Sequence, residues 1–270
     1  MSTTEVRVEH LFTYPLKSGR AVESREAFIA ASGFRDDRRF ALANQDNDFV
    51  SLRSCPTLVH LGCIYLDETW LLSWNGEPGP VVRVLPEGLE RLELKIWGDR
   101  VSVQWVSKEV DRWLSTKAQR PLRLVAFDRD STRWVDPEYA PKETPTMLAD
   151  GFPLLLTSIE SHRALDHWVG EPLDIGRMRP NLVVSGGAPF EEDSWIRLEG
   201  PEVTIELVKP CARCVATTVN PKTGQKGAEP LRSLAVHRKV DNEVIFGQNA
   251  IVLREGIVRV GEVLTIVTRR

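Results

Sequence analysis

The chain has 270 residues, which suits one large domain or two modest ones, and its formal net charge is −3 at pH 7. Hydrophobic residues make up 42% of the chain and charged residues 27%, which are ordinary values for a folded protein. The balance of charge provides no basic field for nucleic acid, and no apolar run approaches the roughly 20 residues that span a bilayer, so we expect neither partner. Four cysteines are too few for a disulfide framework, and the first ten residues lack a secretion-signal layout, so we expect a reducing, cytoplasmic compartment.

Short strands dominate the first 106 residues. The candidates are rich in β-branched or aromatic residues, are separated by Asp, Asn, Gly and Pro, and lie at Val6–Val8, Leu11–Tyr14, Arg39–Ala43, Phe49–Leu52, Leu58–Leu66, Val81–Leu85, Leu92–Trp97 and Val101–Val106. Hairpin turns are predicted at residues 45–48 and 98–99. Many short strands at this spacing indicate a small barrel or sandwich.

The first helical pattern begins at Ser107, a suitable N-cap. Val110, Trp113 and Leu114 follow at helical spacing on one face. The pattern fades before Pro121, and a new strand follows. We therefore predict two domains, residues 1–120 and 121–270.

The second part of the chain mixes strands with a few helices. Residues 128–150 show little periodicity, and such a long loop forms either the rim of a pocket or a mobile surface segment. Thr157 and Glu160 match a capping box that would start a helix, and a short helix is predicted over Glu229–Arg238. Further strands are predicted at Leu182–Val184, Val244–Phe246, Ala250–Arg254, Ile257–Val260 and Val263–Val267. The fold class is therefore mainly β with a few helices.

The stretch Lys209–Gly224, KPCARCVATTVNPKTG, carries the most specific chemical signal. It places two thiols, Cys211 and Cys214, around Arg213, and nearby positive charge favours the thiolate, a strong soft-metal ligand. Four explanations are open: half of a zinc site, a redox pair, two buried structural cysteines, or one metal-ligating thiolate beside a structural cysteine. We favour the last, with Cys214 as the metal ligand.

Several other segments could bind an anion. Lys17-Ser18-Gly19 follows a strand end, where backbone N–H groups can approach a ligand, although the residue pattern alone favours an exposed turn lysine. Arg38 belongs to an arginine cluster that suits phosphate but that neighbouring aspartates can neutralise. Arg179 and Asn181 flank Pro180 and can point the same way along an extended segment, which suits one wall of a small-molecule pocket.

Six motifs occur in the order seen in one known family. They are YPLKS, DRRFAL, DGFPLLL, RPNLVVSG, KPCARCVATTVNPKTG and FGQN, starting at Tyr14, Asp37, Asp150, Arg179, Lys209 and Phe246. On these motifs the chain resembles MOSC-domain proteins with an N-terminal β-barrel domain, such as the mitochondrial amidoxime reducing component and its bacterial relatives. The similarity covers nearly the whole chain, and it implies an N-terminal β-barrel-like domain followed by a β-barrel MOSC domain.

The resemblance also implies a cofactor and the residues that bind it. The cofactor is a molybdenum cofactor, a pterin dithiolene with a terminal phosphate, and the ligand to molybdenum is the second cysteine of the motif, Cys214, which is also the expected catalytic residue. The matching cofactor contacts are Lys17, Ser18, Arg38, Gly151, Phe152, Arg179, Asn181, Ala212, Arg213 and Asn249.

Some of these positions depart from the family pattern. Gly151 and Phe152 replace small hydroxyl residues, so any contact there would come from the backbone. Asn249 stands at a tyrosine position, and Asn220 replaces an aspartate, which alters polarity on the substrate side. The chain ends soon after its last predicted strand, without the iron–sulfur domain of some bacterial relatives, so electrons are expected from a separate ferredoxin- or cytochrome-type protein.

Three functions follow as hypotheses. The leading one is a molybdenum-dependent oxidoreductase that reduces N-hydroxylated small molecules such as amidoximes and hydroxylamines. The second is a molybdenum-cofactor carrier or sulfur-transfer protein, since some MOSC domains occur in molybdenum-cofactor sulfurases. The third is a zinc-stabilised or metal-free interaction module.

Overall fold

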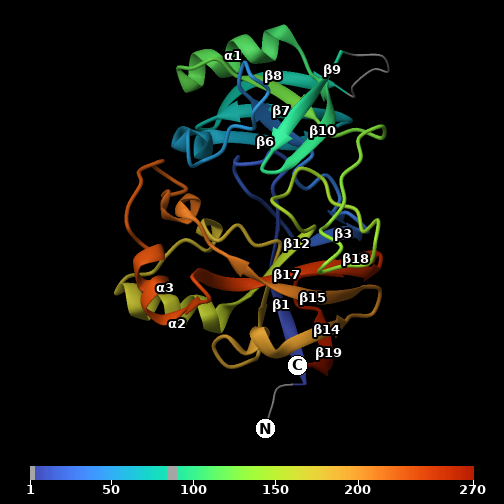
Figure 1. The fold of residues 1–270 in the computed structure, drawn as a ribbon, viewed down its shortest axis with the longest axis vertical. Coiled ribbons are helices and arrows are strands. Elements are labelled where there is room, and N and C mark those ends of the chain that lie inside the picture. The colour runs from blue at the N-terminus through green and yellow to red at the C-terminus, as the bar shows by residue number, and fades with distance from the viewer. Residues whose placement is uncertain (1–3, 84–89) are drawn as a thin grey trace.

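The computed structural model describes residues 4–83 and 90–270. Within them, 44% of residues lie in strands and three α-helices are present, which confirms the mainly β class. Figure 1 shows two bodies stacked along the long axis of the molecule, with both chain ends at the far end of the lower body. We call the upper one the first body and the lower one the barrel.

A closed sheet of seven strands forms the barrel. Its strands follow one another around the sheet in the order β12 (Leu154–Ser158), β13 (Leu182–Ser185), β1 (Glu5–Thr13), β19 (Val263–Arg269), β14 (Trp195–Glu199), β15 (Thr204–Ala212) and β17 (Glu243–Arg254). Leu154 of β12 pairs with Ala250 of β17, which closes the sheet. Its interior is filled by the alternate, inward-facing residues of each strand, among them Val6, Val8, Leu156, Trp195 and Leu207.

Smaller elements cover the barrel. β2 (Val22–Ser24) and β16 (Lys239–Val240) extend its sheet, and a separate small sheet joins β18 (Gly256–Arg259), β3 (Glu26–Ala30) and β4 (Gly33–Phe34). Two helices, α2 (Ile159–Val169) and α3 (Leu231–His237), pack together beside β17. The short 3₁₀ turns η2 (Ile175–Arg177), η3 (Glu191–Ser194) and η4 (Val215–Thr218) lie near them. A further 3₁₀ turn, η1 (Pro56–His60), belongs to the first body.

Two sheets and one helix form the first body. One sheet has the order β5 (Phe40–Ala43), β11 (Arg123–Ala126), β10 (Asp99–Trp105), β9 (Arg91–Ile96), and the other has the order β6 (Leu61–Leu66), β7 (Thr69–Trp74), β8 (Glu77–Arg83). The helix α1 (Lys108–Ala118) packs on this body with Val110 and Leu114 buried. The predicted cap is confirmed, because the Ser107 side chain accepts a hydrogen bond from the Val110 N–H.

Several local predictions differ from the structure. Residues 49–52 form no strand and make only the isolated bridge of Phe49 to Ala43, and the segment from 58 begins as the 3₁₀ turn η1. The cap of α2 is Ser158, which accepts from the Ser161 N–H, whereas Thr157 instead meets the His162 ring at 3.1 Å. Residues 84 and 85 of the predicted strand 81–85 lie outside the described residues.

Strand pairing joins segments from both sides of the predicted boundary at residue 120, which itself stays a prediction. β1 pairs with β13 and β19, so residues 5–13 belong to the barrel. β11 pairs with β5 and β10, so residues 123–126 belong to the first body. The chain therefore crosses between the two bodies after the N-terminal strands and again after β11.

Candidate functional site

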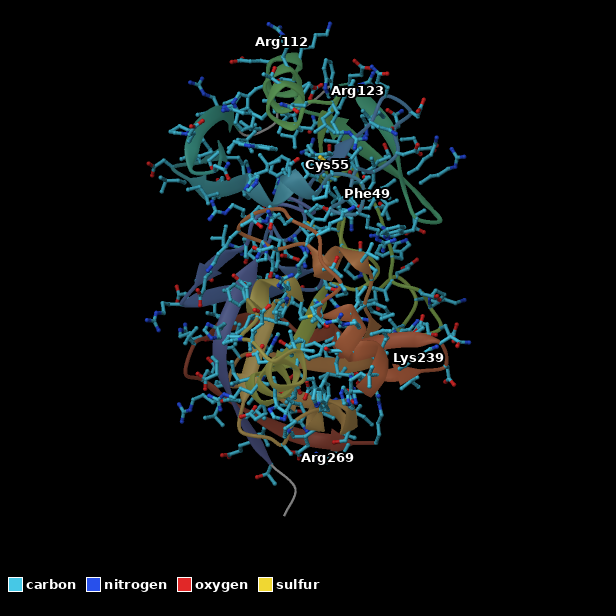
Figure 2. The ribbon with its side chains drawn as sticks, turned by 90° about the vertical axis from the view of Figure 1, so that its left-hand side faces the viewer. Phe49, Cys55, Arg112, Arg123, Lys239 and Arg269 are labelled. Carbon is cyan, nitrogen blue, oxygen red and sulfur yellow. The ribbon has the colours of Figure 1, made fainter. Side chains whose placement is uncertain are left out.

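A cavity of about 740 Å³ lies between the first body and the barrel. Residues 49–53 and Trp97 line it from the first body, and Figure 2 shows Phe49 on the side of that body that faces the barrel. Segments 177–181 and 209–217 line it from the other side. All eleven residues selected from the sequence border this one cavity: Lys17, Ser18, Arg38, Gly151, Phe152, Arg179, Asn181, Ala212, Arg213, Cys214 and Asn249.

Three of these residues have left-handed backbone conformations. The φ angles are +72° at Ser18, +50° at Arg38 and +54° at Arg179. A non-glycine residue in this region costs on the order of 1–3 kcal/mol and persists only where the surroundings hold it. Hydrogen bonds from the Lys17 N–H to Phe40 O (2.7 Å) and from the Arg38 N–H to Tyr14 O (2.7 Å) hold two of these turns. The fold therefore holds Ser18, Arg38 and Arg179 at this cavity in a conformation that has an energetic cost.

Two arginines sandwich a buried tyrosine at the cavity wall. The guanidinium carbons of Arg38 and Arg179 lie 4.3 and 4.2 Å from the centre of the Tyr14 ring. Arg38 pairs with the buried Asp37 and donates to Asn181 Oδ1 at 3.1 Å, and Arg179 donates to Gly19 O at 2.7 Å. Burial, together with the neighbouring Arg38, lowers the pKa of Arg179 to about 10, so this arginine remains cationic at neutral pH. The two positive charges are therefore fixed in place.

Lys17 is buried, unlike the exposed turn lysine that its sequence pattern alone favours. Its side chain is 6% exposed, and Nζ lies 2.5 Å from Asp150 Oδ1 and 4.7 Å from the centre of the Phe49 ring. Burial lowers the pKa of Lys17 to about 8, although the Asp150 carboxylate opposes the shift. Trp97 Nε1 also donates to Asp150 Oδ1 at 3.2 Å, so Lys17, Asp150 and Trp97 form a linked group on the cavity rim.

The two cysteines of the C-x-x-C motif have different surroundings. β15 ends at Ala212, and the backbone then turns into η4, where the Thr217 N–H and hydroxyl donate to Cys214 O at 3.0 and 2.9 Å. Arg213 Nη1 donates to Cys211 Sγ at 2.9 Å. Within residues 4–83 and 90–270, the Cys214 thiol has no such hydrogen bond. Cys211 is therefore occupied by Arg213, while Cys214 borders the cavity with its sulfur available.

The remaining explanations of the motif find less support. Both cysteines are free thiols, and Cys214 opens a 3₁₀ turn rather than the α-helix of a thioredoxin-type pair. Cys55 and Cys63 are buried in the core of the first body, where they cannot complete a zinc site with Cys214. Over the described part of the chain, no group of three or more His, Cys, Asp or Glu side chains is arranged to hold a metal ion. A metal on Cys214 would thus need ligands from outside the protein.

The donor set of the cavity fits an anionic group that brings such ligands. Three arginines that line the cavity have a buried side-chain nitrogen without a hydrogen-bond partner: Nε of Arg177, Nη2 of Arg179 and Nε of Arg213. Each of these nitrogens can donate to an acceptor on a bound group. A phosphate-bearing cofactor with soft metal ligands would satisfy both the cations and the thiol of Cys214.

Some cavity residues were not selected from the sequence. Arg177 lies two residues before the motif that starts at Arg179, and its Nη1 donates to Thr217 O and Thr218 O at 3.4 and 3.3 Å. Trp97 follows a strand and precedes a hairpin turn, which is no signal for a cavity wall. Asn220 does not line the cavity; its side chain accepts from the Lys222 N–H at 2.9 Å and closes its own turn.

Two family models match the chain. The model for the MOSC N-terminal beta barrel domain matches residues 5–121, and the model for the MOSC domain matches residues 143–265. The chain is 31% identical to mitochondrial amidoxime-reducing component 1 of Xenopus laevis, covering 97% of this chain and 82% of that protein. It is 28% identical to the Homo sapiens protein of the same name, covering 94% and 81%. A molybdenum cofactor sulfurase of Oryza sativa subsp. japonica is 25% identical and covers 91% of this chain, which spans 32% of that protein.

These relatives contradict the expected cytoplasmic location. The proteins from Xenopus laevis, Mus musculus and Homo sapiens are all named as mitochondrial, and the expectation is therefore wrong. The expected location was inferred from the small number of cysteines and from the first ten residues. Free thiols indicate a reducing environment, but they do not distinguish one reducing compartment from another. None of the helices in residues 4–83 and 90–270 is long and apolar enough to cross a membrane.

The matches agree with the six sequence motifs and with the β-rich architecture. Together the two models cover most of the chain, and the relatives support a function connected with the molybdenum cofactor. The chain belongs to the MOSC-domain family, in the group whose members carry an N-terminal MOSC β-barrel domain.

Proposed function

We propose that this chain is a molybdenum-cofactor-dependent oxidoreductase that reduces N-hydroxylated small molecules, such as amidoximes and hydroxylamines. One observation carries the proposal: the cavity of about 740 Å³ brings the available Cys214 thiol together with the cations Lys17, Arg38, Arg179 and Arg213. The names of the amidoxime-reducing relatives support the substrate class.

The cavity residues have distinct roles in this proposal. Cys214 is the protein ligand to molybdenum, since a thiolate is a strong soft-metal ligand. Lys17, Arg38 and Arg179 hold the phosphate and pterin through charge-assisted hydrogen bonds. Ser18, Asn181 and Arg213 provide further donors, while Gly151, Phe152, Ala212 and Asn249 line the cavity beside them.

The reaction removes one oxygen from nitrogen. The N–O bond breaks, two electrons and two protons are consumed, and the products are the reduced nitrogen compound and one water. When bound, the molybdenum cofactor supplies the two-electron redox chemistry for this step. The proposed electron donor is a separate ferredoxin- or cytochrome-type protein. The chain itself binds the cofactor, orients the substrate and shields the reacting atoms between its two bodies.

The experiment begins with the protein purified from a host that makes the cofactor. We expect molybdenum and oxidised pterin in matching amounts, and reduction of an amidoxime to the amidine when an artificial low-potential donor is supplied. Cys214→Ser protein serves as the control without molybdenum. A fully loaded and reduced protein that converts neither amidoximes nor hydroxylamines would overturn the proposal.

A second candidate is a molybdenum-cofactor carrier or sulfur-transfer protein. The similarity to the Oryza sativa molybdenum cofactor sulfurase favours it, although this chain spans only 32% of that protein. Transfer of the cofactor from this protein to a cofactor-free molybdenum enzyme, without any reductase activity of its own, would support this candidate over the first.

A further inference from the structure

A second cavity, of about 800 Å³, adjoins the first. Five residues line both cavities, so the two lie side by side: Trp97, Asp150, Gly151, Phe152 and Lys209. We call the first one the inner cavity. We call the second one the outer groove. Its size lies within the roughly 300–1,000 Å³ typical of small-molecule sites. None of the eleven residues selected from the sequence belongs to the outer groove alone.

Aromatic side chains line the outer groove on both sides. The turn between β9 and β10 provides Trp97, and the segment 132–139 provides Trp134 and Tyr139, with Phe152 at the junction to the inner cavity. Trp97 is 48% exposed and Trp134 is 49% exposed. The exposed part of each ring is apolar surface on which a planar ligand can stack.

Contacts within the protein hold these rings in place. The Arg53 guanidinium lies 4.1 Å from the centre of the Trp97 ring, and Phe49 meets the same ring edge-on at 5.5 Å. On the other side, Lys209 Nζ lies 4.2 Å from the centre of the Tyr139 ring, which packs edge-on to Phe152 at 6.1 Å. The aromatic walls are therefore set before any ligand arrives, which lowers the entropy cost of binding.

Arg133 fastens the segment that carries Trp134. Its side chain is 5% exposed and donates to Met147 O at 3.1 Å, to Asp150 O at 3.1 Å and to Ala149 O. It also pairs with Asp99 at 2.8 Å. Residues 128–150, which the sequence left as a pocket rim or a mobile loop, thus form an ordered rim between the two cavities.

Three charged side chains of the outer groove are ion-paired within the protein: Arg133 with Asp99, Asp150 with Lys17, and Arg100 with Glu93 at 2.7 Å. The groove also contains the exposed carboxylate of Asp136, which repels an anion, and Lys209, which lies over the Tyr139 ring. The half-exposed ring of Trp134 is then the main apolar surface for a ligand. Such a groove favours an uncharged planar ring over a phosphate or a strongly charged peptide.

We propose that the outer groove binds the aromatic part of an N-hydroxylated substrate, with Trp134 as the main stacking surface and Trp97 at the entrance to the inner cavity. The inference rests on the proposed function, because it takes the inner cavity as the place where the N–O bond is broken. The substrate class is thereby narrowed to aryl amidoximes and aryl hydroxylamines. Trp134 acts as a specificity-determining residue.

The test compares benzamidoxime and acetamidoxime, two compounds with the same reacting group. Benzamidoxime carries a phenyl ring where acetamidoxime carries a methyl group. Their dissociation constants are measured by calorimetry on cofactor-free protein, and KM and kcat are measured on loaded protein. We expect Trp134→Ala to weaken benzamidoxime binding by about fivefold and to raise its KM by a similar factor, since aromatic pairs contribute this much. Acetamidoxime binding and kcat should stay unchanged.

Two control variants accompany the test. Trp134→Phe retains a ring and should restore most of the benzamidoxime affinity. Val236→Ala removes an exposed apolar side chain that lines neither cavity. Equal affinities of the wild type and Trp134→Ala for benzamidoxime would overturn the inference, as would an equal loss for both compounds. If loaded wild type reduces neither compound, the proposed function fails, while the binding data on cofactor-free protein still decide the role of the groove.

Discussion

The inner cavity and the outer groove share a boundary but recognise ligands by different means. The inner cavity is walled by cations, and two of them, Arg38 and Arg179, have left-handed backbones and stack on Tyr14. The outer groove is lined by the aromatic rings of Trp97, Trp134, Tyr139 and Phe152, and two of its charged side chains, Arg133 and Asp150, are ion-paired within the protein. The difference fits the two proposed roles, in which fixed cations would retain an anionic cofactor and partly exposed rings would bind a substrate that must leave again.

The largest expected effect is on the molybdenum content of proteins in which one of the two cysteines is replaced, and it tests the proposed role of the inner cavity. Cys214→Ser should reduce the molybdenum content to background, because it removes the only protein thiolate proposed for the metal. Cys211→Ser should lower it by about tenfold, the lower end of the range for groups that orient a metal ligand. Metal analysis of both purified variants measures the effect, and equal molybdenum in wild type and Cys214→Ser protein would contradict the assignment.

The second largest effect is expected for reversal of the charge at Arg179, measured as the pterin content of the purified protein. Arg179→Glu should lower pterin content by about tenfold or more, because a buried guanidinium in contact with an anion is replaced by a repelling carboxylate. Arg179→Lys retains the charge without the planar fork and should give an intermediate result. Arg163→Glu on the exposed face of α2 is the matched charge control. Unchanged pterin fluorescence in Arg179→Glu protein would remove this residue from the cofactor site.

A third variant tests whether Arg133 holds the rim of the outer groove in place. Arg133→Met should lower the free energy of unfolding by about 3 kcal/mol, because three backbone carbonyls and Asp99 lose a buried charged donor. Arg100→Met, which removes an exposed ion pair from the same groove, should cost less than about 1 kcal/mol. Urea unfolding of both variants provides the values, and similar losses would show that Arg133 does not fasten the rim.

The smallest expected effect concerns pH at the inner wall. In the empty protein Lys17 has a pKa of about 8, so its charge is present at pH 7 and largely lost at pH 9. Binding of sulfate, whose own charge is constant over this range, should therefore weaken by about threefold as pH rises from 7 to 9. Calorimetry measures the change, and Lys17→Met should abolish it. A pH dependence that persists in Lys17→Met protein would assign the titration to another group.

The sequence predicted the inner cavity far better than the outer groove. Short motifs such as KPCARC and RPN encode the turns that carry Cys214, Arg179 and Asn181, and those turns depend mainly on neighbouring residues. Trp97, Trp134 and Arg133 lie in segments without a local signal. Their importance comes from contacts across the chain, for example 34 residues apart between Arg133 and Asp99 and 53 between Trp97 and Asp150.

The burial of Lys17 could not be predicted from the local sequence either. Its turn follows from Pro15 and Gly19, but its exposure depends on Phe49 and Asp150 from distant segments. Periodicity could not reveal these neighbours, and an exposed lysine was the more common outcome for such a turn.

By itself the sequence determined the β-rich class, the capped start of α1 and the order of the family motifs, because strand composition, helix caps and motifs are properties of short segments. Only the tertiary structure decided that β1 lies in the barrel, that β12 and β17 close it, and that the outer groove lies beside the cavity that Cys214 borders. These features depend on pairing between residues far apart in the chain. Such pairing is selected by the packing of the whole core, and no local pattern specifies it.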